Sequence, residues 1–312
     1  MISSLTQPHY PNAALGIEEE RITAISLQGQ GRGRFAVKQA ATVDLPAGLL
    51  RPGFIEQNIT DANEFAACLH EAAESAGLLS QRRWSVALPS NTARTAILVL
   101  ETEPASNQEA GEVIDWKAEQ SFGAPAAELR LSTQKIFPDN KGRSRYFTTA
   151  VTLSVIDEYE KQFETLGWKV GLILPRAMGE ANWIAGKAEI GDSLLISGNS
   201  DGFTALLLRS SEPEVVRSVT CTPDEVDDEI YRLLMFYNDR FGGDQHGNAL
   251  LRRLMVVGKD LVPEKVQAIA SDALGRALNV LGPQDVGLDL PGGGFSFNDL
   301  AAPAGLAVLG FR

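Results

Sequence analysis

The sequence predicts an α/β protein made of two similar halves, with an additional α+β unit inserted into the first half. Two observations lead to this prediction. Apolar runs typical of strands alternate with helical periods along the 312 residues, a pattern that favours sheets covered by helices. In addition, each half opens with the same order of elements: a hairpin, a third strand, a helix and a further strand. The length suffices for two domains or one large one.

The first half begins with two apolar runs, at 14–18 and 21–27, on either side of a charged turn. A glycine-rich turn follows, and alternating side chains then predict a third strand over 35–45. Apolar residues at helical spacing predict a helix over 60–77, which starts with capping residues and ends at a glycine. A short apolar run at 84–88, closed by a proline, predicts the next strand.

A run of further elements interrupts the first half between about residues 90 and 175. The expected strands are 93–100, 129–137, 145–153 and 167–175, and the expected helices are 106–122, which carries Trp116, and 155–166. We expect them to form an inserted α+β subdomain within a first domain of residues 1–190.

The second half, residues 191–312, repeats the opening order after a helix at 176–187. Its expected elements are a hairpin over 194–208, a strand over 214–220, a helix over 223–241, a strand over 252–257, a helix over 263–278 and a closing helix over 297–311 that contains Pro303. The two hairpins share a Thr-Ala step, at 23–24 and 204–205. Such a duplication is the plan of the actin-like (ribonuclease H-like) fold, in which two domains surround a cleft.

Composition and charge exclude several classes of function. The net charge of −12 argues against a nucleic-acid partner and against direct docking on anionic lipid. No run reaches about 18 apolar residues, so we expect no transmembrane span, and the N-terminal residues lack the pattern of a signal peptide. Two cysteines are typical of a reduced, cytosolic protein. The three histidines lie far apart in the sequence and show no metal-ligand spacing.

Three segments between residues 45 and 136 resemble PilM, the actin-like protein of type IV pilus assembly. They read LPAGLLRPGFIEQNITDANEFAACLHEAAESAGL, WSVALPSNTARTAILVLETEP and EVIDWKAEQSFGAPAAEL. The closing FNDLAAPAGLAVLG is also similar to the last helix of that family. The resemblance spans nearly the whole chain and rests on the ordered set of segments, since no single motif is specific. The cytoplasmic domain of GspL and the protein FtsA are more distant relatives of the same kind.

PilM-like proteins bind ATP in the cleft, and the resemblance assigns the first phosphate turn to residues 16–22. Glu18 stands where the family has an aspartate, and the turn is shorter than in the family. The turn carries three consecutive glutamates, which would face a polyphosphate without amide donors to offset their charge. We expect these three side chains to lie in water at the tip of the hairpin.

The second phosphate turn, SGNSDG, lies within the hairpin over 194–208. Ser197 replaces the family's aspartate, which holds magnesium or its water, and Gly198 comes one position early. A serine hydroxyl is a poor substitute for a carboxylate around a hard cation. Asp201 and Gly202 complete the turn, and the sequence leaves open whether they form a purely structural turn or keep a phosphate contact.

The adenine-side strand ends in Gly258 and Lys259, where the family commonly has two adjacent glycines. Lys259 could contact phosphate or simply cap the strand. All three elements of the nucleotide site are therefore altered together, and we expect MgATP to bind weakly or not at all. The remnant nucleotide-binding residues are Glu18, Ser197, Gly198, Asp201, Gly202, Gly258 and Lys259.

The leading interpretation is a non-catalytic PilM-like scaffold of a type IV pilus or type II secretion platform, with no cofactor. By the resemblance, it would lie in the cytoplasm, peripheral to the inner membrane, and dock the N-terminal peptide of a PilN-like membrane protein. The peptide groove would lie between the sheet of residues 14–44 and the insertion. The alternative is a PilM-like protein that still binds ATP and magnesium through drifted motifs. A phosphotransferase on the same fold would need a general base and intact phosphate turns, which the sequence lacks.

Overall fold

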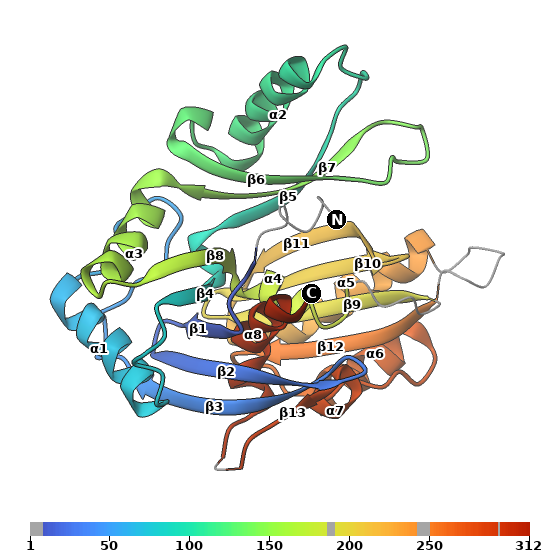
Figure 1. Ribbon diagram of the computed structural model, residues 1–312. Coiled ribbons are helices and arrows are strands. Elements are labelled where there is room, and N and C mark those ends of the chain that lie inside the picture. Colours follow the sequence, from blue (N-terminus) through green and yellow to red (C-terminus); the bar gives the residue numbers. More distant parts are fainter. Residues whose placement is uncertain (1–8, 186–190, 242–249, 293) are drawn as a thin grey trace.

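The computed structural model describes residues 9–185, 191–241, 250–292 and 294–312, and in these residues the strands form three sheets (Figure 1). The largest sheet is formed by strands of the first half of the chain and by the last strand of the whole chain. Its strands are β1 (Ala13–Ile17), β2 (Arg21–Gly31), β3 (Arg34–Asp44), β4 (Arg83–Leu88), β8 (Lys169–Pro175) and β13 (Leu288–Asp289). The order across this six-stranded sheet is β13-β3-β2-β1-β4-β8.

The second sheet has four strands, in the order β11-β10-β9-β12. The strands are β9 (Asp192–Asn199), β10 (Gly202–Arg209), β11 (Glu212–Thr220) and β12 (Leu251–Gly258). In both large sheets, the first strand of the hairpin pairs antiparallel with the second and parallel with the strand that follows the helix. The predicted repeat of a hairpin, a third strand, a helix and a parallel strand is confirmed.

Helices cover the sheets and connect their strands. They are α1 (Ala62–Ser75), α2 (Asn107–Phe122), α3 (Leu153–Thr165), α4 (Arg176–Ala181), α5 (Val226–Phe241), α6 (Pro263–Leu274), α7 (Pro283–Val286) and α8 (Phe297–Ala307). Capping residues explain their limits: Asp61 accepts hydrogen bonds from the first turn of α1, and Ser106 does the same for α2. Helix α6 ends before the predicted residue 278 because Gly275 adopts the left-handed C-cap conformation. Of the predicted helix 176–187, residues 186–187 lie outside the described residues.

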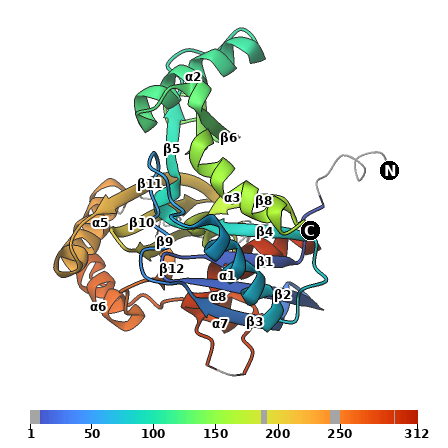
Figure 2. The ribbon, with the colours of Figure 1, turned by 90° about the vertical axis from the view of Figure 1, so that its left-hand side faces the viewer.

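The third sheet is a separate unit that stands above the two larger sheets (Figure 2). Its strands β5 (Arg94–Val99), β6 (Leu129–Ile136) and β7 (Arg145–Thr152) have the order β5-β7-β6. Helix α2 packs on one face, where Ile114, Ala118 and Phe122 join a small apolar core with Leu98 and Leu129. The apolar period of α2 therefore covers one side of this sheet, while Val151 and Phe147 on the other side pack against the cores of the larger sheets.

The expected insertion, about 90–175, contains two elements that the structure joins to the largest sheet. Strand β8 pairs in parallel with β4, and Ile156, Tyr159 and Phe163 of α3 enter the core that α1 shares with that sheet. Val170 and Ile173 of β8 pack against that same core. Because α3 and β8 join the largest sheet and its core, the separate unit ends at β7. The division of the chain near residue 190 stays a prediction, although β13 pairs with β3 of the first half.

Helix α8 lies at the centre of the molecule, between the two large sheets and beside α4 (Figure 1). Its apolar residues, including Leu300 and Leu306, share one core with residues of both sheets. The predicted helix with an internal proline is confirmed: Pro303 packs against Gly16 of β1, where a Cβ would lie 3.1 Å from the proline ring. In the described ranges, no helix is long and apolar enough to cross a membrane.

The crossing of α4 and α8 requires two glycines. A Cβ at Gly305 would lie 1.9 Å from the carbonyl oxygen of Gly179, and a Cβ at Gly179 would lie 2.5 Å from that of Ala302. Gly305→Ala should therefore lower the free energy of unfolding by about 1–3 kcal/mol or more through overpacking. Urea denaturation measures the change.

The matched control is Gly111→Ala in α2, where no atom outside the adjacent residues and backbone of the helix itself lies within 4 Å of the added Cβ. This substitution should raise stability by about 0.5–1 kcal/mol, because alanine favours a helix over glycine. Equal effects of the two substitutions would contradict the close helix crossing.

Candidate functional site

The two predicted phosphate turns and the end of β12 meet at one small cavity. Glu18, Gly198 and Lys259 line it, together with Arg176 and the turn of Ser90. The cavity has a volume of about 50 Å³. The other predicted residues, Ser197, Asp201, Gly202 and Gly258, do not line it. The structure thus brings together one residue from each of the three predicted elements.

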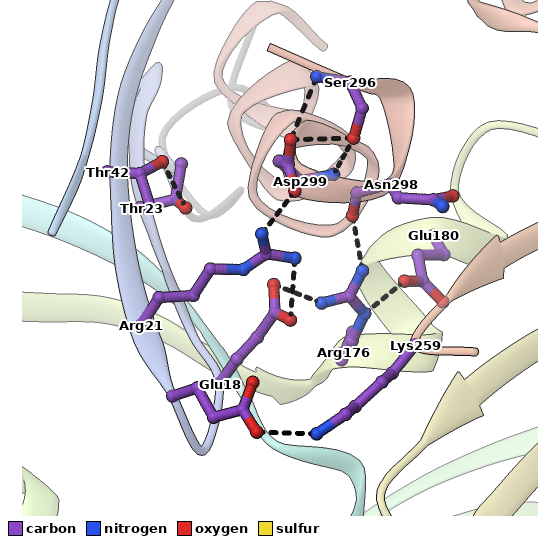
Figure 3. Close-up of polar contacts among 11 residues, drawn as sticks. Glu18, Arg21, Thr23, Thr42, Arg176, Glu180, Lys259, Ser296, Asn298 and Asp299 are labelled. Carbon is purple, nitrogen blue, oxygen red and sulfur yellow. Dashed lines mark hydrogen bonds and ion pairs between the residues drawn. The ribbon is translucent and has the colours of Figure 1, made fainter. Parts of the chain in front are cut away.

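The first turn is held by ion pairs (Figure 3). Glu18 Oε2 lies 3.2 Å from Arg21 Nη2, and Glu18 Oε1 lies 2.5 Å from Arg176 Nη1. Arg21 also pairs with Asp299 at 2.7 Å, and Asp299 caps the start of α8 through Ser296. The expectation that all three glutamates lie in water is therefore wrong for Glu18, because two guanidinium groups bind its carboxylate.

Arg176 is the buried centre of this network, with 5% of its surface exposed. Its Nε donates to Glu180 Oε1 at 2.6 Å, and its Nη2 donates to the carbonyl oxygen of Asn298 at 2.5 Å. Burial alone would lower the pKa of Arg176, but the carboxylates of Glu180 and Glu18 outweigh burial and raise that pKa. The guanidinium stays charged and ties the first hairpin turn to α4 and α8.

Glu180 and Ser197 lie side by side and do not line the cavity, and both are fully buried. Burial raises the pKa of Glu180, while Arg176 and the nearby Ser197 hydroxyl lower it in part. Neither Glu180 Oε2 nor Ser197 Oγ has a well-formed hydrogen bond within the described residues. Ser197 therefore faces a buried carboxylate of its own chain, whereas a magnesium ligand would face the cavity.

Contacts also cross between the two halves at the mouth of the cavity. Lys259 Nζ lies 2.7 Å from Glu20 Oε1, and this lysine lowers the pKa of Glu20. Asp201 Oδ2 accepts a hydrogen bond of 2.6 Å from Asn91 Nδ2. Because these side chains are exposed, the contacts contribute little to stability. They nevertheless occupy the groups that a phosphate would otherwise meet.

The glycines of the predicted site have a structural reason of their own. A Cβ at Gly258 would lie 2.3 Å from the carbonyl oxygen of Gly198, and a Cβ at Gly198 would lie 2.2 Å from that of Lys259. Strands β9 and β12 can pair at this end only if both residues lack a side chain. Gly202, with φ of 137°, likewise approaches the backbone of β11.

A larger cavity, called the first cavity below, lies between β8, α3 and the face of β6 and β7 opposite α2. Its volume is about 300 Å³, and its walls include Arg130, Ser132, Thr149, Val151 and Leu172. The side chains at 130, 132 and 134 face their cross-strand partners at 151, 149 and 147, so they form the face opposite α2. Within the described part of the chain, β8 pairs only with β4, so one edge of β8 is open toward this cavity.

Sequence reasoning missed the residues that organise the small cavity: Arg176, Glu180, Arg21 and Asp299. One local signal was present. Arg176 and Glu180 are four residues apart in the otherwise small and apolar segment RAMGEANW, a spacing that forms ion pairs on a helix. The pairing of Arg176 with Glu18 joins distant parts of the chain and leaves no local signal.

The comparisons with known proteins bear on the fold. No protein-family model matches the sequence, and no curated protein does. A chain of the PilM–PilN type IV pilus biogenesis complex is similar, with 15% identity and a TM-score of 0.72 over 98% of this chain and 100% of that one. The expected PilM-like, actin-like fold is confirmed by this similarity.

Two further solved structures are similar at lower scores. The cytoplasmic domain of EpsL, an inner-membrane component of the type II secretion system of Vibrio cholerae, has 12% identity and a TM-score of 0.45, over 86% of this chain and 96% of that one. A Bacteroides thetaiotaomicron protein with an actin-like ATPase fold and unknown function has 10% identity and a TM-score of 0.47, over 96% of this chain and 98% of that one.

Removing the buried guanidinium should be far more damaging than removing the exposed ammonium. Arg176→Met leaves the carboxylates of Glu18 and Glu180 without their main partner, and we expect a loss of about 3–5 kcal/mol in the free energy of unfolding. The control Lys259→Met breaks only an exposed pair and should change it by less than about 1 kcal/mol. Chemical denaturation at pH 7 measures the free energy of unfolding of both variants. If Arg176→Met were as stable as the unchanged protein, the role assigned to Arg176 would be refuted.

Proposed function

We propose that the chain is a non-catalytic assembly scaffold of a type IV pilus or type II secretion platform, which binds a peptide of a PilN-like inner-membrane protein in the first cavity. The observation that carries the proposal is this cavity beside the open edge of β8, in a chain with the fold found in the PilM–PilN complex. The sequence predicted one wall of the groove from residues 14–44, but none of these residues lines the cavity. The scaffold would lie in the cytoplasm and be held at the inner membrane through its partner.

The chemistry of the first cavity suits an extended N-terminal peptide. The open edge of β8 presents backbone N–H and C=O groups, and an added strand would pair with them. Val170, Leu172 and Ile173 are half-buried and line the cavity, so they can receive apolar side chains of the peptide. The net charge of −12 favours basic residues near the peptide, because opposite charge speeds encounter.

The small cavity supports a scaffold without a cofactor. Its volume of about 50 Å³ falls well below the roughly 300–1,000 Å³ of ligand pockets. The positive groups that could meet a phosphate, Arg176 and Lys259, already bind Glu18 and Glu20. The alternative, an ATP- and magnesium-binding protein, would require the pair of Arg176 with Glu18 to separate and leave the Glu18 carboxylate, held by Arg21 alone, beside the phosphate.

A matched pair of substitutions on β6 tests the peptide site. Ser132 is exposed and lines the first cavity, while Thr133 is exposed on the opposite face of the same strand. Ser132→Trp should fill the cavity and weaken peptide binding by about tenfold or more, which corresponds to about 1.4 kcal/mol. The Thr133→Trp variant should bind the peptide with the same affinity as the unchanged protein.

The probes are synthetic peptides of the cytoplasmic N-terminal segments of single-span membrane proteins encoded beside the gene, and fluorescence anisotropy measures their binding. If both substitutions leave the affinity unchanged, the peptide binds elsewhere. If no such peptide binds the unchanged protein, the scaffold proposal itself fails.

A further inference from the structure

We infer that the bound peptide continues past β8 into a second cavity, where the carboxylate of Glu212 binds a basic side chain of the peptide. This inference rests on the proposed function and extends it. It assigns a second binding site to the partner, formed by both halves of the chain, and a chemical requirement for the peptide segment that reaches it.

The second cavity adjoins the first one beside β8. It has a volume of about 420 Å³, and it shares Ser132, Thr149, Leu172 and Leu174 with the first cavity. These shared residues place both cavities under the same face of β6 and β7. A peptide that adds to the edge of β8 would follow its seven residues, about 23 Å of extended chain. One extended segment can therefore occupy both cavities.

The far wall of the second cavity belongs to the second half of the chain. Leu206 and Leu208 of β10 and Glu212 of β11 line it, whereas the lining of the first cavity lies entirely between residues 88 and 175. Figure 1 shows β10 and β11 below the three-stranded sheet, on the side away from α3. A peptide in both cavities would thus contact both halves, and a peptide in the first cavity alone would contact only one.

Glu212 supplies the charge that selects the ligand. Its Oε2 is shielded from solvent and has no hydrogen-bond partner within the described residues. The neighbouring Glu214, by contrast, pairs with Arg145 of β7 at 2.8 Å. Glu212 lines the second cavity, and its unpaired carboxylate oxygen is unfavourable, so a basic group that draws the carboxylate toward the cavity would remove that penalty.

The surroundings of Glu212 favour lysine or arginine over a small polar donor. Among the described residues that line the second cavity, Glu212 is the one charged residue, and most of the others are apolar, such as Phe147, Leu206 and Leu208. The methylene stem of a lysine or arginine can pack on such a wall while its charged end reaches a carboxylate. The geometry therefore requires a basic residue on the peptide, beyond the part that pairs with β8.

A double-mutant cycle tests the contact. The probe is the synthetic N-terminal peptide that binds the unchanged protein and binds the Ser132→Trp variant more weakly. It is compared with versions of the peptide in which each lysine or arginine is replaced by alanine. Glu212→Gln keeps the shape of the side chain and removes its charge. We expect Glu212→Gln and one of the alanine peptides each to weaken binding by about tenfold or more, with no further loss when the two are combined.

Glu128→Gln is the matched control, because Glu128 is exposed and lines neither cavity; it should leave the affinity unchanged. If Glu212→Gln also binds with unchanged affinity while Ser132→Trp still blocks binding, the second site is refuted and the proposed function stands. Additive losses in the cycle would also refute the contact. If no peptide binds the unchanged protein, both proposals fail.

Discussion

The buried guanidinium of Arg176 is the interaction on which the centre of the molecule depends. It binds Glu18 of the first hairpin turn, Glu180 of α4 and the backbone of Asn298 in α8. Removing these charges from water costs free energy, and the close ion pairs offset this desolvation penalty only while all partners are present. The positions of the turn, of α4 and of the start of α8 are thus set together. The turn assigned to phosphate is held by the protein's own side chains.

Close backbone packing imposes a second constraint on the same region. Helices α4 and α8 cross at Gly179 and Gly305, and strands β9 and β12 meet at Gly198 and Gly258. Each contact leaves no room for a Cβ, so these glycines are explained by packing alone. A glycine-rich turn in this fold therefore does not by itself indicate a phosphate site, since interiors packed to this density fix the backbone whether or not a ligand binds.

Local signals predicted most of the fold. The hairpins, the capped starts of α1 and α2 and the repeated order of elements follow from residues close together in the sequence. The sheet to which β8 belongs could not be predicted from local signals, because the sequence of an apolar strand does not indicate which strand it pairs with. The site shows the same limit. Glu18, Gly198 and Lys259, which the sequence assigned to one site, line one cavity, but the pairs of Arg176 with Glu18 and of Lys259 with Glu20 join residues far apart in the chain. Ser197 does not line the cavity, because successive side chains of strand β9 point to opposite faces and Gly198 is the residue that lines it.

Calorimetric titration of MgATP into the full chain tests most directly whether ion pairs have taken the place of a nucleotide. With Glu18 and Glu20 bound to Arg176 and Lys259, and with a cavity of about 50 Å³, we expect no saturable binding at micromolar MgATP. A dissociation constant near 1 µM, about −8 kcal/mol, would contradict this account and support the alternative of a working ATP site.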